Sequence, residues 1–236
     1  MCTVSFVTAN NQFIITSNRD EKVVRPAIEP QKYLINNTNI IFPKDPKAGG
    51  TWYAVSENGT ILVLLNGASE KHEVANHYRK SRGLIVLDLI SSNLMVLEFW
   101  KTIVLDNIEP FTLVLFQDKK LYQLRWDGNY KEAINLDETK SYIWSSSTLY
   151  SKDIRENRAS WFRVFLDTTS AITPTAMLNF HRYTEEDNFE NGLVINRNQL
   201  MQTLSITQAV VDKEKVTLNY YDLQTQKDFI NLFSII

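Results

Sequence analysis

The residues best suited to chemistry stand at the start of the chain. Cys2 is the only cysteine among 236 residues, and it directly follows Met1. A small residue at position 2 permits removal of the initiator methionine, which would leave Cys2 with a free α-amine beside its own thiol. Such an amine titrates near pH ~7.7–8.0, close to a thiol at ~8.5, so it can activate its own side chain as an N-terminal nucleophile. The alternative is an inert thiol, because a lone cysteine commonly packs as a small buried hydrophobic residue.

Two expected strands position this cysteine. Residues 2–9 and 12–18 are rich in Val, Ile, Phe and Thr, and Asn10-Asn11 separates them. Asparagine tolerates the positive φ of a two-residue hairpin turn, so this stretch predicts an antiparallel hairpin. In that register the numbers of paired residues sum to 21, and Phe6 faces Ile15.

The same register predicts that Cys2 faces Arg19, with Asp20 next to it where the strand ends. A nearby cation favours the thiolate, and a carboxylate can hold the ammonium group of the N-terminus. A turn one residue longer or shorter would instead move Arg19 to the other face of the sheet. The alternative interpretation of the Arg19-Asp20 pair is an ordinary surface ion pair.

Four short motifs follow one another along the first quarter of the chain. They are Met1-Cys2-Thr3, Asn18-Arg19-Asp20-Glu21, Arg25-Pro26 and Gly49-Gly50-Thr51-Trp52. In this order and spacing they resemble the NRDE family, which includes Transport and Golgi organisation protein 2. That family is similar in turn to the choloylglycine hydrolase and penicillin acylase branch of N-terminal nucleophile hydrolases, which cleave amides with an N-terminal cysteine. The resemblance implies an α+β fold built as a four-layer α-β-β-α sandwich.

The resemblance also implies a set of site residues. It assigns catalysis to Cys2 as the nucleophile, to Arg19 and Asp20 as its helpers, and to Asn66, whose side-chain amide is a suitable donor for a tetrahedral oxyanion. The substrate-binding residues that it implies are Asn18, Trp52, Ser146 and Arg197. The alternatives are packing in the core for Trp52 and an ordinary turn position for Arg197. We therefore expect a hydrolase that acts on an amide or related acyl bond of a small molecule and needs no cofactor.

Two positions depart from the family's pattern. Ser146 stands where the family often has an asparagine, and Leu204 stands where its animal members have an arginine. The animal members are linked to haem and lipid handling. A second hypothesis is therefore a non-catalytic carrier or chaperone for haem or an acyl lipid, built on the same scaffold.

The composition excludes several classes of protein. The 25 Lys and Arg residues nearly balance the 27 Asp and Glu residues, so neither a nucleic-acid footprint nor a polybasic membrane patch is expected. No apolar run reaches the ~18 residues of a spanning helix, and the N-terminus lacks the basic and apolar regions of a signal peptide. We therefore expect a cytoplasmic protein without stable membrane insertion. His72 and His77 are not at metal-ligand spacing, so no metal site is expected, and the oligomeric state stays open.

The rest of the sequence predicts one domain over residues 1–236, with two pairs of helices between groups of strands. The helices are expected at 82–90, 93–104, 151–168 and from Pro174 onward. Residues 22–50 contain four prolines and are interpreted as a mostly irregular excursion with one short strand. On the third helix, Arg158 is assigned to a solvated face, and on the fourth helix His181 is interpreted as structural.

Overall fold

The structure is a computed structural model that describes residues 3–213 and 215–234. One antiparallel sheet, the first sheet, contains β1 (Thr3–Ala9), β2 (Gln12–Lys22), β10 (Tyr142–Ser145), β11 (Asn196–Arg197), β12 (Met201–Asp212), β13 (Lys215–Asp222) and β14 (Lys227–Ser234). The second sheet contains β3 (Ile28–Ile35), β4 (Thr38–Lys44), β5 (Tyr53–Ser56), β6 (Ile61–Asn66), β7 (Phe111–Gln117), β8 (Lys120–Trp126) and β9 (Lys131–Leu136). The second sheet follows the chain in order, whereas the first has the order β10-β1-β2-β12-β13-β14, with β11 beside β12.

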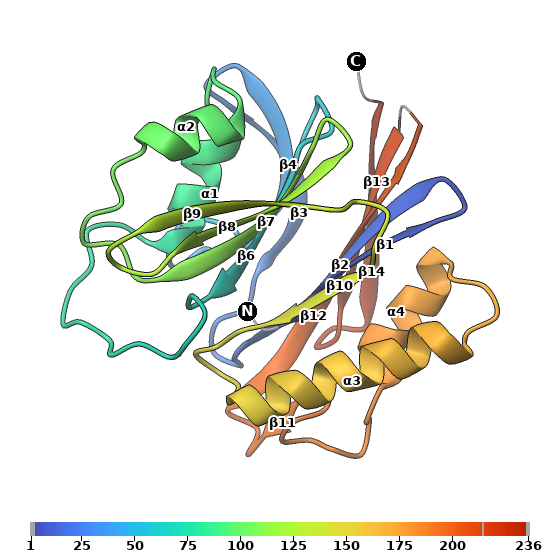
Figure 1. Ribbon diagram of the computed structural model, residues 1–236. Coiled ribbons are helices and arrows are strands. Elements are labelled where there is room, and N and C mark those ends of the chain that lie inside the picture. The colour runs from blue at the N-terminus through green and yellow to red at the C-terminus, as the bar shows by residue number, and fades with distance from the viewer. Residues whose placement is uncertain (1–2, 214, 235–236) are drawn as a thin grey trace.

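Helices cover the outer face of each sheet (Figure 1). They are α1 (Arg82–Ile90), α2 (Val96–Thr102), α3 (Lys152–Thr168) and α4 (Pro174–Tyr183). The α1 helix packs on β5 and β6 of the second sheet, while α3 packs on β10 and α4 packs on β2 and β12 of the first. The fold is therefore the α-β-β-α sandwich that the family resemblance implied.

The largest apolar core lies between the two sheets and extends under α1 and α2. Residues 61–65 of β6 are all apolar because both faces of this strand are buried. One face packs against α1 and the other against the first sheet. A smaller apolar cluster fills the space between the first sheet and the helices α3 and α4. Both faces of the first sheet are thus covered, which gives each strand residue a defined side.

The N-terminal hairpin has the predicted register. Asn10 and Asn11 adopt φ angles of 53° and 61°, as a two-residue turn between twisted strands requires. The paired residues include Thr3 with Asn18 and Phe6 with Ile15. The predicted pair of Cys2 with Arg19 lies outside the described residues.

Two predictions about elements were wrong. Residues 22–50 contain a long hairpin, β3 and β4, because Pro30 lies in an edge strand, where a missing N–H removes no ladder bond on the open side. The second helix begins at Val96, because the Ser92 hydroxyl accepts the Leu94 N–H at 3.0 Å and holds that segment in a turn. Within the described chain, no helix is both long enough and apolar enough to span a bilayer.

Candidate functional site

Consecutive residues of β2 point to opposite faces of the first sheet, as alternation in a strand requires. Arg19 faces the second sheet, where its guanidinium carbon lies 4.4 Å from the ring centroid of Trp52. Its Nη2 atom donates to the Arg25 carbonyl at 2.9 Å. Asn18 and Asp20 face the helix layer instead, so the three residues serve two different environments.

Arg19 and Trp52 line a cavity of about 350 Å³ between the end of the first sheet and the N-terminus of α1, which we name the charged cavity. Its charged wall residues are Arg19, Arg25, Lys80, Arg82, Glu21, Asp45 and Glu109. Gly50 and Gly83 also lie in the wall, where their backbones approach so closely that a Cβ on either would overlap the other segment. This approach of the loop before β5 to α1 closes one side of the cavity.

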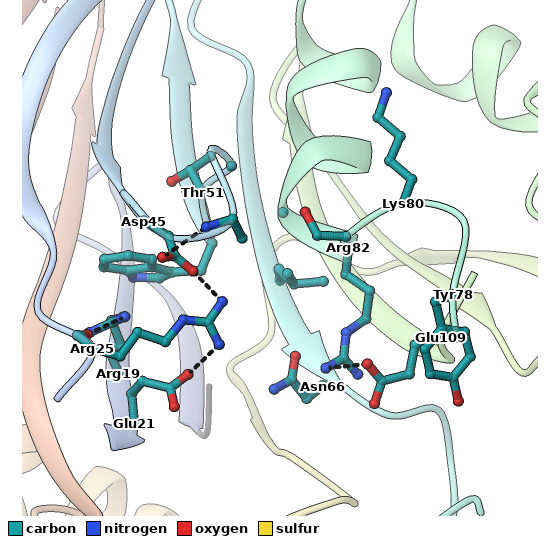
Figure 2. A pocket seen from close by; sticks show the side chains of 16 residues that line it. Arg19, Glu21, Arg25, Asp45, Thr51, Asn66, Tyr78, Lys80, Arg82 and Glu109 are labelled. Carbon is teal, nitrogen blue, oxygen red and sulfur yellow. Dashed lines mark hydrogen bonds and ion pairs between the residues drawn. The ribbon is translucent and has the colours of Figure 1, made fainter. Parts of the chain in front are cut away.

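All three carboxylates of the charged cavity are engaged in ion pairs (Figure 2). Arg25 lies between Glu21, at 3.4 Å, and Asp45. On the opposite wall Arg82 contacts Glu109 at 2.9 Å. Asn66, at the end of β6, lies between these two walls (Figure 2).

Several N–H donors at this cavity have no acceptor among the described residues. They are Nη1 of Arg19, Nε of Arg25 and Nε1 of Trp52, all of them buried. Burial is also the main reason that the pKa of Arg19 is lowered, with the Glu21 carboxylate opposing the change. An unsatisfied buried donor costs about 1–3 kcal/mol, so a ligand oxygen that accepted these N–H groups would be stabilised. The cavity is therefore suited to a polar, oxygen-bearing ligand.

Asn66 also belongs to the wall of a second cavity, of about 180 Å³, on the side of β10. Ser146 lines this second cavity and donates its hydroxyl to the Asn66 carbonyl at 2.8 Å. Gly67 follows with a φ of 84°, and a Cβ there would overlap the Ser147 hydroxyl. The backbone around Asn66 is thus held from the β10 side, and no hydrogen bond to its side-chain amide is recorded in the described part of the chain.

On the helix side of the first sheet, Asp20 is held by two hydroxyl groups. Tyr150 donates to Oδ2 at 2.6 Å, and Thr203 donates to Oδ1 at 2.5 Å. The Tyr150 ring in turn lies under two guanidinium groups, with the Arg158 carbon 3.6 Å and the Arg197 carbon 5.2 Å from its centroid. The Asp20 carboxylate therefore has an enforced orientation.

Arg158 is the centre of this arrangement, and its assignment to a solvated face was wrong. The side chain is fully buried, and its Nη1 donates to the Thr3 hydroxyl at 2.5 Å. Its other nitrogens donate to the carbonyls of Asn191 and Gly192. The periodicity of α3 contained a signal, since Arg158 precedes the buried Phe162 by one helical turn and shares its face.

Asn18, His181 and Ser5 form a second buried network on the helix side. The Asn18 amide donates to the carbonyls of His181 and Leu193 at 3.0 and 2.7 Å. Its Oδ1 is 2.5 Å from His181 Nδ1, so Nδ1 carries the proton and Nε2 accepts from the Ser5 hydroxyl at 2.7 Å. Burial, with a contribution from Arg158, lowers the pKa of His181 to about 3, which keeps the ring neutral.

Not every predicted site residue reaches a cavity. Arg19, Trp52 and Asn66 line the charged cavity, and Ser146 lines the second one. Asn18 has both amide hydrogens and its oxygen engaged by protein groups, so the structure gives it a scaffolding position in place of a substrate contact. Arg197 likewise lies outside both cavities, over Tyr150, with Nε donating to the Glu190 carbonyl at 2.8 Å.

Several residues at the site were not predicted. Arg25, Asp45, Arg82 and Glu109 line the charged cavity, although none of them had been assigned to the site. Their positions depend on loops that meet only in the folded chain, so local periodicity could not have found them. Among residues 3–213 and 215–234, no group of three or more His, Asp or Glu side chains could hold a metal ion.

Solved structures with a similar fold are amide hydrolases at low sequence identity. A Caenorhabditis elegans N-acylethanolamine-hydrolyzing acid amidase ortholog matches with a TM-score of 0.60 and 11% identity, over 88% of this chain and 92% of its own. Two variants of conjugated bile acid hydrolase from Clostridium perfringens match with TM-scores of 0.55 and 0.50 and identities of 10% and 9%, each over 99% of this chain and over 92% and 97% of their own. These likenesses show the fold of N-terminal nucleophile hydrolases.

Comparison of the sequence itself identifies one family. No curated protein matches the sequence closely enough to count as a relative. The family model described as Transport and Golgi organisation 2 matches residues 1–229. Because that match covers nearly the whole chain and includes the motifs that line the charged cavity, the chain belongs to the Transport and Golgi organisation 2 family, known also by its NRDE motif.

Proposed function

We propose that this protein is an N-terminal-cysteine hydrolase that acts on an amide or related acyl bond of a small, polar molecule. Cys2, freed by removal of Met1, is the proposed nucleophile. Arg19 is proposed to stabilise the thiolate or to bind the substrate, and Asp20 to hold the N-terminal ammonium group. Asn66 is the proposed oxyanion donor.

The observation that carries this proposal is the position of Arg19. Its buried Nη1 lacks an acceptor among the described residues, and it shares a cavity with Asn66 at the end of the first sheet. The proposal continues the observed register of Thr3 with Asn18 by one residue. A thiol next to a guanidinium is more easily ionised, because the cation stabilises the thiolate.

In the proposed reaction, the Cys2 sulfur forms a bond to the substrate's carbonyl carbon while the N-terminal amine accepts the thiol proton. The carbonyl oxygen becomes an oxyanion, which the Asn66 side-chain amide stabilises by donating a hydrogen bond. Collapse of this intermediate breaks the C–N bond, and the amine product leaves with the proton. Water then cleaves the thioester, which releases the carboxylic acid and restores the thiol.

The lining of the charged cavity supports a polar substrate over the alternative, a carrier of haem or an acyl lipid. Ligand cavities commonly span about 300–1,000 Å³ and are mostly apolar. This one has about 350 Å³ and a wall with four basic and three acidic residues. An acyl chain or a porphyrin ring would exclude water from these charged groups and would offer its apolar surface to the unsatisfied N–H groups of Arg19 and Trp52, at considerable cost in free energy.

Because the chain has a single cysteine, intact-mass spectrometry can test the proposal directly. Protein expressed without an N-terminal tag is first weighed to establish that Met1 is absent, and it is then incubated with a panel of activated amides. We expect a mass increase equal to one acyl group on the wild-type protein and none on Cys2→Ala. Because the chain has one cysteine, a hydroxylamine-sensitive adduct locates the thioester at Cys2.

The matched control is Cys2→Ser, which keeps an N-terminal hydroxyl nucleophile and should acylate more slowly. Hydrolytic activity in Cys2→Ala, or retention of Met1 in active protein, would overturn the mechanism. Saturable haem or acyl-lipid binding that survives Cys2→Ala, without any acyl adduct on the wild type, would establish the carrier function instead.

A further inference from the structure

The second cavity has no role in the proposed chemistry, although it shares Asn66 with the charged cavity. Its volume of about 180 Å³ corresponds to roughly six water molecules at ~30 Å³ each. That is room for a small polar group with a short linker. It is bounded by β10, the end of β6 and two arginines, Arg125 of β8 and Arg155 of α3.

Three hydroxyl groups of the second cavity already donate to the protein. Those of Ser146, Ser147 and Thr112 donate to backbone carbonyls at 2.8, 3.1 and 3.0 Å. The Trp144 indole donates to the Gln123 side chain at 2.9 Å. The donor hydrogens of these groups are therefore already satisfied within the protein.

The two arginines differ from these groups. In each, the buried Nε has no acceptor among the residues that the structure describes. Both guanidinium groups have carboxylate partners, Glu132 for Arg125 at 3.1 Å and Glu70 for Arg155 at 3.4 Å. However, the side chains of Glu132 and Glu70 are 48% and 74% exposed, whereas those of the arginines are 26% and 22% exposed.

This difference in exposure leaves a net attraction for anions. Ion pairs with well-solvated carboxylates are weak, because water screens them. The guanidinium groups are more enclosed and both line the cavity. Arg155 also donates from Nη1 to the Ser69 carbonyl at 2.8 Å, but each arginine keeps one buried N–H without an acceptor in the described chain. A planar guanidinium is well matched to a carboxylate or phosphate oxygen.

We propose that the second cavity is a subsite for an anionic group, a carboxylate, on the substrate. The amide lies at Asn66, which lines both cavities, and the carboxylate extends between Arg125 and Arg155. The substrate class is then an amide that carries a carboxylate a few atoms from the scissile bond. This inference rests on the proposed function, because only a hydrolase would treat the bound amide as a substrate. Its test measures binding and does not depend on catalysis.

The test measures equilibrium binding to Cys2→Ala protein by ligand-observed NMR. Two matched pairs of probes place the charge on either side of the amide, N-acetylglycine against N-acetylglycinamide, and succinamic acid against succinamide. In at least one pair the carboxylate should bind about tenfold more tightly than its neutral partner, as expected for one charge-assisted hydrogen bond. The pair that shows the preference tells on which side of the amide the carboxylate lies.

Three variants locate the effect. Arg125→Gln and Arg155→Gln should each remove most of the preference for the carboxylate. Arg163→Gln is the matched control, because Arg163 is exposed and lies on the same helix as Arg155. Thermal unfolding of each variant checks that it is folded, and either cavity variant alone suffices for the test.

Equal binding of the charged and neutral probes in both pairs would overturn the subsite, as would a preference that survives in either cavity variant when that variant is folded. These results are distinguishable from a failure of the proposed function. If the preference is present but no acyl-enzyme forms on wild-type protein, the subsite stands and the hydrolase proposal fails. If acylation occurs without any preference, the reverse holds.

Discussion

The two faces of the first sheet differ in how their polar groups are satisfied. On the helix side, Asn18, Asp20 and Arg158 have hydrogen-bond partners from at least two chain segments each. On the side of the charged cavity, Arg19 and Trp52 keep buried N–H groups without acceptors in the described chain. Satisfied networks fix geometry, whereas an unsatisfied donor that belongs to a cavity wall can bind an acceptor on a ligand. The comparison teaches that the helix side acts as the scaffold, which also orients the Asp20 carboxylate, and the cavity side as the working surface.

If that division is right, helix-side substitutions should cost stability, and cavity-side substitutions should cost function. The largest effect is expected for Arg158→Met, which removes the donors to Thr3, Asn191 and Gly192. Breaking such a buried network should lower the free energy of unfolding by about 3–5 kcal/mol in urea titrations. The control Arg163→Met, exposed on the same helix, should stay within about 0.5 kcal/mol. Similar small losses in both variants would contradict the scaffold role.

The next effect concerns pH and His181. The folded protein keeps this ring neutral down to a pKa of about 3, while the unfolded chain takes up the proton near its ordinary value of 6.5. The unfolded state therefore binds more protons below pH 6.5, and stability falls as pH decreases. Between pH 6.5 and 5 the loss should be about 2 kcal/mol, at ~1.4 kcal/mol per pH unit.

The measurement is the free energy of unfolding at several pH values between 7 and 5. His181→Gln should be less stable at pH 7, but its stability should change much less over this range. His77→Gln alters an exposed histidine and should retain the wild-type slope. An unchanged slope in His181→Gln would show that another group is responsible.

On the cavity side, Arg19→Met should change stability by no more than about 1 kcal/mol, because it removes a buried cation together with its unsatisfied donor. The same variant should form the acyl-enzyme about a hundredfold more slowly, as expected when a catalytic donor is lost. Lys22→Met, at an exposed position of the same strand, serves as the control for both measurements. A large loss of stability in Arg19→Met would place Arg19 in the scaffold.

The smallest effect on folding is expected for Trp52→Phe. This change keeps an aromatic ring under Arg19 and deletes one unsatisfied N–H, so stability should stay within about 1 kcal/mol of wild type. Acylation should slow several-fold if the indole N–H contacts substrate. Trp100→Phe is a close control, because Trp100 also has a buried, unsatisfied Nε1 but lies on α2, outside both cavities. Equal acylation rates in the two variants would remove Trp52 from the site.

The sequence predicted the positions of some site residues and not of others. Arg19 and Trp52 belong to motifs that the family resemblance identified, and both line the charged cavity. Arg158 was placed on the solvent side because it lies mostly off the apolar face expected for the helix, yet its burial depends on carbonyls of residues 191 and 192, far along the chain. Asn18 shares the motif of Arg19 but points the opposite way, where His181 engages it.

The sequence alone determined the N-terminal hairpin, its register, the helix that begins after Ser81 and the alternation of groups of strands with two pairs of helices, because turn chemistry, capping and periodicity act between near neighbours. The tertiary structure alone decided which face each polar residue serves. Thr203 reaches Asp20 across 183 positions, and Asn66 meets Ser146 across 80. Such contacts depend on how the two sheets stack and where their ends meet, and no local pattern specifies that arrangement.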